Sequence, residues 1–189
     1  MAFINPSIAV LWFILILYWL ASAPGAKRRI PENSRWRGIV FRLVVGAFLL
    51  LRLKVFHPLS HDLYLRLVPS NPALRLTGLM LCALGIAFAL RARFHLGRNW
   101  GMPMSLQRDH ELITTGPYSR VRHPIYTGIL LAMLGSALAE GTAWLPFLLI
   151  FSAYFIYSAR AEEKLMLRQF PQEYPAYQAR TKMLVPFIW

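Results

Sequence analysis

Long apolar stretches alternate with short polar ones along the first half of the chain. They cover residues 6–23, 36–56 and 72–90, and Pro24 and Gly25 end the first. A transmembrane helix needs about 20 mainly apolar residues. The charged side chains of these stretches lie towards their ends, where long side chains reach the lipid headgroups. The pattern predicts three membrane-spanning helices within residues 1–92.

Two further apolar segments, 125–139 and 142–158, are separated by Glu140 and Gly141 alone. So short a break predicts a tight antiparallel helical hairpin over 124–158, with both open ends on one side. An amphipathic stretch then ends at Pro171, and a short surface helix is expected over 174–182. We therefore expect an all-α, single-domain integral membrane bundle over 1–189. It has about five transmembrane helices, with a cytoplasmic C-terminal helical layer.

Composition supports a membrane protein and charge gives its orientation. The chain is 57% hydrophobic, with a mean hydropathy of +0.43 and a net charge of +13. Its basic residues gather at the ends of apolar stretches, a pattern typical of cytoplasmic loops and anionic headgroups rather than of nucleic-acid binding. We expect the N-terminus outside and the polar residues after Arg91 inside. Cys82 is the single cysteine, so no disulfide framework forms.

The candidate chemistry begins where the predicted hairpin begins. Proline is favoured at the first position of a helix, so Pro124 predicts a helix start with His123 at its cap. A helix N-terminus attracts carboxylate or phosphate, and Arg120 and Arg122 add donors there. Tyr118 and Tyr126 bracket this start. Two aromatic rings so placed can sandwich a flat ligand, although interfacial aromatic residues are common in membrane proteins.

A second cluster, Arg160, Glu162 and Glu163, follows the other end of the hairpin. The hairpin places this cluster near His123, and that convergence predicts a site. Glu162 suits a cationic group and Arg160 an anionic one, while Arg160 and Glu163 share a helix face and are expected to pair. The other histidines (His57, His61 and His95) lack metal-ligand spacing and are expected to be interfacial, so no metal site is predicted.

These residues together resemble the isoprenylcysteine carboxyl methyltransferase family, in the form of a small bacterial or archaeal member. The resemblance runs from residue 94 to the C-terminus and is carried by several motifs. They are Leu96-Gly-Arg-Asn-Trp100, His110-Glu-Leu-Ile-Thr-Thr-Gly-Pro-Tyr118, Arg122-His-Pro-Ile-Tyr-Thr-Gly128 and the pair Glu162-Glu163. Phospholipid methyltransferases share part of this pattern.

The resemblance implies a membrane-embedded methyltransferase that uses S-adenosyl-L-methionine, with 93–189 as the cofactor-binding part. By position, the cofactor contacts are His110, Glu111, Leu112, Ile113, Tyr118, His123, Pro124, Ile125, Tyr126 and Glu162. Family members also hold the substrate with an arginine just before the paired acids. Here Ser158 stands four residues before Glu162, so Arg160 is expected to bind the substrate. The expected catalytic residues are Arg160, Glu163 and His123.

Methyl transfer from a sulfonium is a direct displacement that needs alignment and a dry site. The leading hypothesis is carboxyl methylation of an isoprenylcysteine-like, lipophilic acceptor in the membrane. N-methylation of a phospholipid amine is the alternative, with His123 or Glu163 as proton acceptor. A sterol reductase using NADPH is more distant, because the acid pair suits a phosphate poorly. The non-enzyme alternative is a helical bundle that binds lipid or a partner through its basic face.

Overall fold

The computed structural model describes residues 3–22, 46, 71–100 and 111–186. Apart from Gly46, the predicted span 36–56 lies outside these residues, as do His57, His61 and His110. The described elements are the helices α1 (Ile4–Ser22), α4 (Pro72–Leu96), α5 (Pro124–Glu140), α6 (Leu145–Gln169) and α7 (Glu173–Arg180), with the 3-10 turns η2 (Gly97–Asn99), η3 (Gly116–Ser119) and η4 (Thr142–Trp144). The described part of the chain contains no strand, which confirms the all-α prediction.

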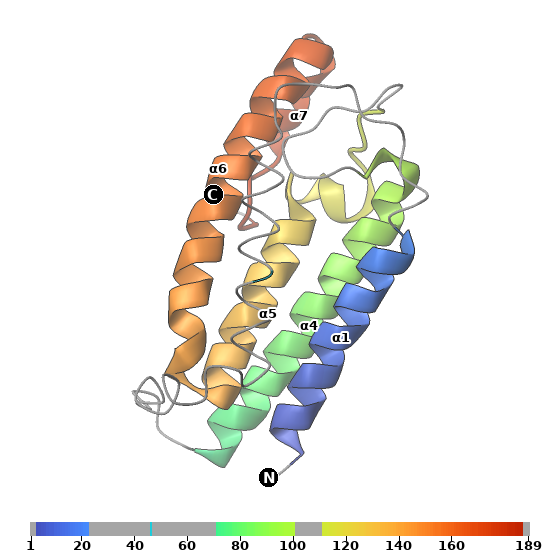
Figure 1. Cartoon of the computed structure of the whole chain (residues 1–189). Helices are drawn as coiled ribbons and strands as arrows, with labels where there is room; N and C mark the ends of the chain where they lie inside the picture. The colour runs from blue at the N-terminus through green and yellow to red at the C-terminus, as the bar shows by residue number, and fades with distance from the viewer. Residues whose placement is uncertain (1–2, 23–45, 47–70, 101–110, 187–189) are drawn as a thin grey trace.

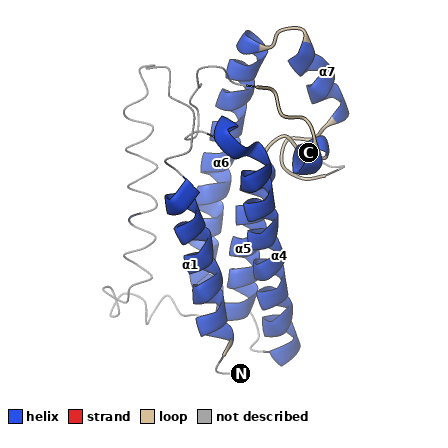
Figure 2. Ribbon diagram, turned by 90° about the vertical axis from the view of Figure 1, so that its right-hand side faces the viewer, coloured by secondary structure: helices blue, strands red, loops and turns tan. Residues whose placement is uncertain are grey.

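Four long helices, α1, α4, α5 and α6, lie side by side (Figure 1). Helices α1 and α4 run in the same direction, α5 returns and α6 rises again. Helix α7 and the segment before α5 gather at the end where α5 begins (Figure 2). Helix α6 continues to Gln169, well beyond the predicted end at Ser158. The charged cluster Arg160, Glu162 and Glu163 thus lies on the second hairpin helix, as predicted, and the amphipathic residues that follow extend the same helix.

Local signals account for most helix ends. Asn71 accepts a hydrogen bond from the N–H of Ala73 at 2.8 Å and caps α4, whose first residue is Pro72. Helix α4 stops at Gly97, where φ is +55°, and α5 stops at Gly141, where φ is +118°. Residues with side chains rarely adopt such φ values, so these two glycines are effective stops.

Helices α4 and α5 pack with their backbones in direct contact. Gly78 and Gly85 of α4 face Gly128 and Gly135 of α5. A Cβ atom added to Gly85 would lie 2.5 Å from the nitrogen of Ala132, and one added to Gly135 would lie 2.4 Å from the nitrogen of Cys82. Small residues that let helix backbones approach closely are the usual means of helix association in membranes. The register of α4 against α5 therefore depends on these glycines.

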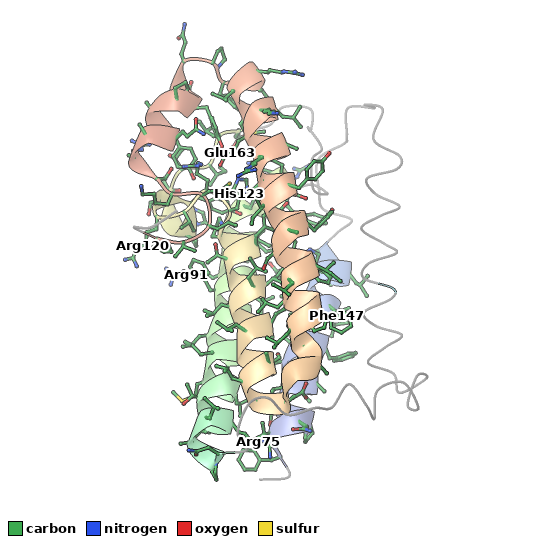
Figure 3. The ribbon with its side chains drawn as sticks, turned by 90° about the vertical axis from the view of Figure 1, so that its left-hand side faces the viewer. Arg75, Arg91, Arg120, His123, Phe147 and Glu163 are labelled. Carbon is green, nitrogen blue, oxygen red and sulfur yellow. The ribbon has the colours of Figure 1, made fainter. Side chains whose placement is uncertain are left out.

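Arginines bind neighbouring helices at both ends of α4. Arg75 donates from Nε to the carbonyl of Ala139, near the end of α5, at 3.0 Å (Figure 3). Arg93, only 3% exposed, donates from Nη2 to the carbonyl of Ser22, the last residue of α1, at 3.0 Å. The terminal carbonyls of a helix lack partners within it and carry partial negative charge. Both arginines therefore stabilise the bundle, although the sequence suggested only interfacial charges.

Two described helices, Ile4–Ser22 and Pro72–Asn99, are long and apolar enough to cross a membrane, and Pro124–Glu140 is a shorter apolar helix. Their outward faces carry large apolar side chains, including Phe13 at 63% and Leu84 at 60% exposure. Water disfavours such contiguous apolar surface, whereas lipid accepts it.

We expect Gly85→Ala to lower stability by about 1–3 kcal/mol, because the new methyl group must displace the backbone of α5. Thermal unfolding of the detergent-solubilised protein measures the loss. Leu84→Ala is the matched control, since its side chain points outwards from the neighbouring position. Equal melting temperatures for the two variants would show that the close contact is not needed.

Candidate functional site

The two predicted clusters meet at the end of the bundle where α5 begins. His123 Nδ1 lies 3.4 Å from Glu162 Oε2, and Nε2 lies 3.3 Å from Glu163 Oε1. Figure 3 shows His123 and Glu163 close together, where α5 begins beside α6. Nearly 40 residues separate these groups in sequence, and the course of α5 and α6 brings them together as the hairpin predicted. We call Arg122, His123, Glu162 and Glu163 the charge cluster.

Arg122 binds other groups of the protein through Nε and Nη1. Its Nε lies 2.6 Å from Glu163 Oε1, and its Nη1 donates to the carbonyl of Gln178 at 3.2 Å and to that of Thr181. Charge-assisted contacts of this kind are strong and directional. These groups of Arg122 therefore bind the protein, whereas the sequence had suggested that they serve as donors to an anion beside the helix start. Arg120 is exposed and points away from the bundle (Figure 3).

Glu163 contacts three side chains through its two oxygens. One oxygen faces Arg122 and His123, and the other accepts from Gln178 Nε2 at 3.0 Å. Its expected partner, Arg160, is exposed on α6, so the predicted pairing of Arg160 with Glu163 is wrong. The i, i+3 spacing allowed that pair, but two cations on another segment approach the carboxylate instead.

Glu162 is the more accessible acid. Its side chain is 24% exposed, against 10% for that of Glu163. Tyr126 donates a hydrogen bond from its hydroxyl to Glu162 Oε1 at 2.6 Å, and His123 approaches the other oxygen. The described contacts thus orient Glu162 from the α5 side while part of its surface stays open.

The two tyrosines differ from the sandwich that the sequence suggested. The ring of Tyr126 stacks on His123, with centroids 5.5 Å apart, and on Phe155, with centroids 4.5 Å apart. The protein itself therefore supplies the stacking partners of Tyr126. Tyr118 is 7% exposed and lies against the ring of His95, with a centroid distance of 6.4 Å. Its carbonyl accepts from the hydroxyl of Tyr177 at 2.7 Å.

His95, which the sequence predicted to be interfacial, is exposed and packs against the turn at Gly116. Its Nε2 lies 2.9 Å from Thr115 Oγ1, and a Cβ atom on Gly116 would come within 2.7 Å of its ring. The φ of Gly116 is +60°, so glycine is favoured there by both conformation and space. The Gly-Pro turn was visible in the sequence, but its contact with the last turn of α4 was not.

The other predicted cofactor residues lie along the same segment. Glu111 donates its N–H to Asn99 Oδ1 at 3.4 Å, and Leu112 and Ile113 are half-buried. Pro124 and Ile125 are buried at the start of α5. The N–H groups of the first turn of a helix have no partner within it, so this start is suited to an anion.

The geometry favours the cationic form of His123. Each ring nitrogen faces a carboxylate, and both can donate only when both carry a proton. Burial lowers the pKa of His123, but Glu162 and Glu163 outweigh it and raise that pKa above its ordinary value. Glu163 lies beyond the apolar part of α6. Burial raises its pKa, but His123 and Arg122 outweigh burial and hold the pKa below its ordinary value.

Backbone contacts from the C-terminal end complete the site. The N–H of Arg122 donates to the carbonyl of Lys182 at 2.8 Å, and that of His123 donates to the carbonyl of Met183 at 3.1 Å. Val121 and Lys182 form an isolated parallel bridge. No sequence motif pointed to these residues, because backbone groups leave no side-chain signature.

Comparison with known proteins places this arrangement in a family. The phospholipid methyltransferase family matches residues 74–173, more than half of the chain, and the chain belongs to this family. The matched region contains all of α5 and α6, including all four members of the charge cluster.

Among curated proteins, the nickel-cobalt-cadmium resistance protein NccN of Alcaligenes xylosoxydans xylosoxydans is 34% identical over 94 residues, covering 48% of this chain and 44% of that protein. Protein-S-isoprenylcysteine O-methyltransferase of Saccharomyces cerevisiae is 28% identical over 153 residues, covering 79% of this chain and 60% of that protein. The chain thus spans about half the length of these relatives.

Among solved structures, the eukaryotic intramembrane Ras methyltransferase ICMT superposes with a TM-score of 0.55 at 24% identity. The match covers 84% of this chain and 55% of that one. The shared fold and the apolar described helices identify the chain as an integral membrane protein.

We expect the ligand-free protein to be most stable in mildly acidic solution. Stability from His123 is fully present below its ordinary pKa of 6.5 and is lost as pH rises through the raised value. Stability from Glu163 is present above its ordinary pKa of 4.5 and is lost as pH falls through the lowered value. Both contributions are therefore present together between pH 4.5 and 6.5.

Melting temperatures of the detergent-solubilised protein across pH 4–10 measure this profile. In His123→Gln the decline on the alkaline side should largely disappear, because the titrating group is gone. An unchanged alkaline decline in this variant would assign it to another group.

Proposed function

We propose that the protein is an S-adenosyl-L-methionine-dependent methyltransferase that acts on a lipophilic acceptor in the membrane. Its favoured reaction is carboxyl methylation of an isoprenylcysteine-like, prenylated substrate. The juxtaposition of the α5 start with Glu162 carries the proposal, because it sets an anion-binding group beside a cation-binding one. The S-isoprenylcysteine O-methyltransferase relatives support the acceptor class.

The residues present fit this cofactor. The N–H groups at the start of α5, near Pro124 and Ile125, suit its carboxylate. Glu162, the more exposed acid, suits its cationic sulfonium and ammonium groups. Glu111, Leu112, Ile113 and Tyr118 offer a mixed polar and apolar wall for the nucleoside, with His110 expected beside them. Tyr126 contributes by holding Glu162 rather than by stacking.

When bound, the cofactor supplies an electrophilic methyl group on a sulfonium. The protein must align the acceptor with it and exclude water. His123 carries a proton between two acids and therefore does not serve as a base in this state. Its role is to hold the carboxylates of Glu162 and Glu163 in place. A carboxylate acceptor arrives ionised and needs no base, so the charged state of His123 favours carboxyl methylation.

Amine N-methylation of a phospholipid is the second candidate. The name of the matching family favours this reaction, because the family is named for phospholipid methylation. An amine acceptor must lose a proton. Glu163 is the remaining acceptor in the cluster, although Arg122, His123 and Gln178 already occupy it.

The proposed topology has about five spans, with the N-terminus outside and the site on the cytoplasmic side. The parallel course of α1 and α4 supports it, because the two helices then cross in the same direction (Figure 1). The site end also holds the arginines that the positive-inside rule places in the cytoplasm, including Arg91 (Figure 3).

We expect S-adenosylhomocysteine to bind the purified protein and Glu162→Gln to weaken that binding more than tenfold, about 1.4 kcal/mol. The neutral amide can no longer offset the positive charge of the ligand. Calorimetric titration measures both dissociation constants. Glu173→Gln is the control, because this exposed acid lies on α7. Absence of heat with folded wild-type protein would overturn the proposed function, and an unchanged Glu162→Gln constant would remove Glu162 from the site.

For Arg160→Ala we expect loss of turnover with S-adenosylhomocysteine affinity retained, because Arg160 is assigned to the acceptor and lies outside the charge cluster. Turnover is followed by transfer of labelled methyl to an S-farnesylated cysteine derivative. Arg168→Ala, a second exposed arginine of α6, is the control. Full turnover in Arg160→Ala would make Arg160 a surface residue with no part in the reaction.

A further inference from the structure

Residues 177–184 lie beyond the region matched by the family, which ends at residue 173. No motif in the sequence assigns them a role. In the structure they include the end of α7 and the chain that follows it, and they return to the start of α5 (Figure 2). We call residues 177–184 the C-terminal segment.

The C-terminal segment binds the backbone immediately before α5. Lys182 and Met183 accept the N–H groups of Arg122 and His123 at 2.8 and 3.1 Å. His123 has φ −124° and ψ 60°, outside the helical region, so α5 itself does not set its conformation. These two bonds, together with the bond from the N–H of Thr127 to the carbonyl of His123, hold the backbone that carries the imidazole ring.

The same segment holds the side chains behind His123. The carbonyls of Gln178 and Thr181 accept from the guanidinium of Arg122, which in turn binds Glu163. Gln178 Nε2 donates to Glu163 Oε2 at 3.0 Å, leaving Oε1 to face His123. The orientation of the buried carboxylate therefore depends on α7 as well as on α6.

Two hydroxyl groups anchor the segment on either side of the site. Thr127 Oγ1 lies 2.6 Å from the carbonyl of Leu184 and 3.1 Å from that of His123, and its single proton favours the shorter contact. Tyr177 donates its hydroxyl to the carbonyl of Tyr118 at 2.7 Å. Met183 and Leu184 are buried, at 7% and 3% exposure. The segment thus joins α5 to the turn that carries Tyr118.

We propose that the C-terminal segment is a positioning element of the cofactor site. It touches His123 and Glu163 and acts through them, by presenting Glu162 and the α5 start in a fixed relation. This proposal rests on the proposed function, because the ligand that would bind at the positioned residues is S-adenosyl-L-methionine. The positioning residues are Gln178 of the segment and Thr127 of α5, which binds the segment at Leu184, and neither is assigned to the cofactor itself.

The test compares two pairs of variants by calorimetric titration with S-adenosylhomocysteine. Gln178→Ala removes the bond to Glu163, and Gln172→Ala is its control because Gln172 is exposed at the other end of α7. Thr127→Val removes the bond to Leu184, whereas Thr127→Ser keeps a hydroxyl there. We expect Gln178→Ala and Thr127→Val to raise the dissociation constant about tenfold, and the other two to bind like wild type.

Melting temperatures separate positioning from folding. The proposal holds if affinity falls in Gln178→Ala and Thr127→Val while their melting temperatures equal those of their controls. Thr127→Ser must also bind like wild type. It is overturned if both disrupted variants bind like wild type, or if affinity falls only in step with melting temperature. Should Gln178→Ala fail to fold, the threonine pair decides alone. No binding by wild type would overturn the proposed function, and this proposal with it.

Discussion

The direct backbone contact between α4 and α5 is the constraint on which the rest of the structure depends. Gly85 and Gly135 leave no room for a side chain, so the two helices are held at one spacing and one register. That register sets the end of α4 beside the start of α5. His95 can then pack on the turn at Gly116, and this turn leads the chain back to His123. A contact in the apolar bundle thus determines the position of polar groups at its end.

The positive and negative charges of the charge cluster balance one another. Arg122 and a protonated His123 provide two positive charges, and Glu162 and Glu163 provide two negative ones. Buried charges are tolerated only when paired and hydrogen-bonded, and here Gln178 and Tyr126 complete the bonding of the acids. The two acids differ in the exposure of their side chains. Glu163 is closed in by its partners, whereas the side chain of Glu162 remains 24% exposed.

The features that could be predicted from the sequence are the local ones. Pro124, Gly141 and Pro171 mark helix ends through backbone chemistry, and the short break at Gly141 was enough to bring His123 near Glu162. The partners of Glu163 could not be predicted. The i, i+3 rule describes pairs within one helix, whereas the cations that contact Glu163, Arg122 and His123, lie on another segment. The C-terminal contacts were equally hidden, since carbonyls of any residue type can make them.

The position of Arg160, the residue proposed to bind the acceptor, bears on how the proposed acceptor approaches. Ser158 is fully buried on α6, one turn before Glu162, whereas Arg160 is exposed. Successive helical residues turn by about 100°, so two positions apart point in nearly opposite directions. An acceptor carboxylate that uses Arg160 must therefore meet it at the surface of the bundle, and one that enters the bundle meets the serine hydroxyl. The proposed lipophilic acceptor, anchored in the bilayer, can approach Arg160 at the surface in this way. Its apolar chain would remain among the exposed side chains of the helices, and its polar end would reach the edge of the charge cluster.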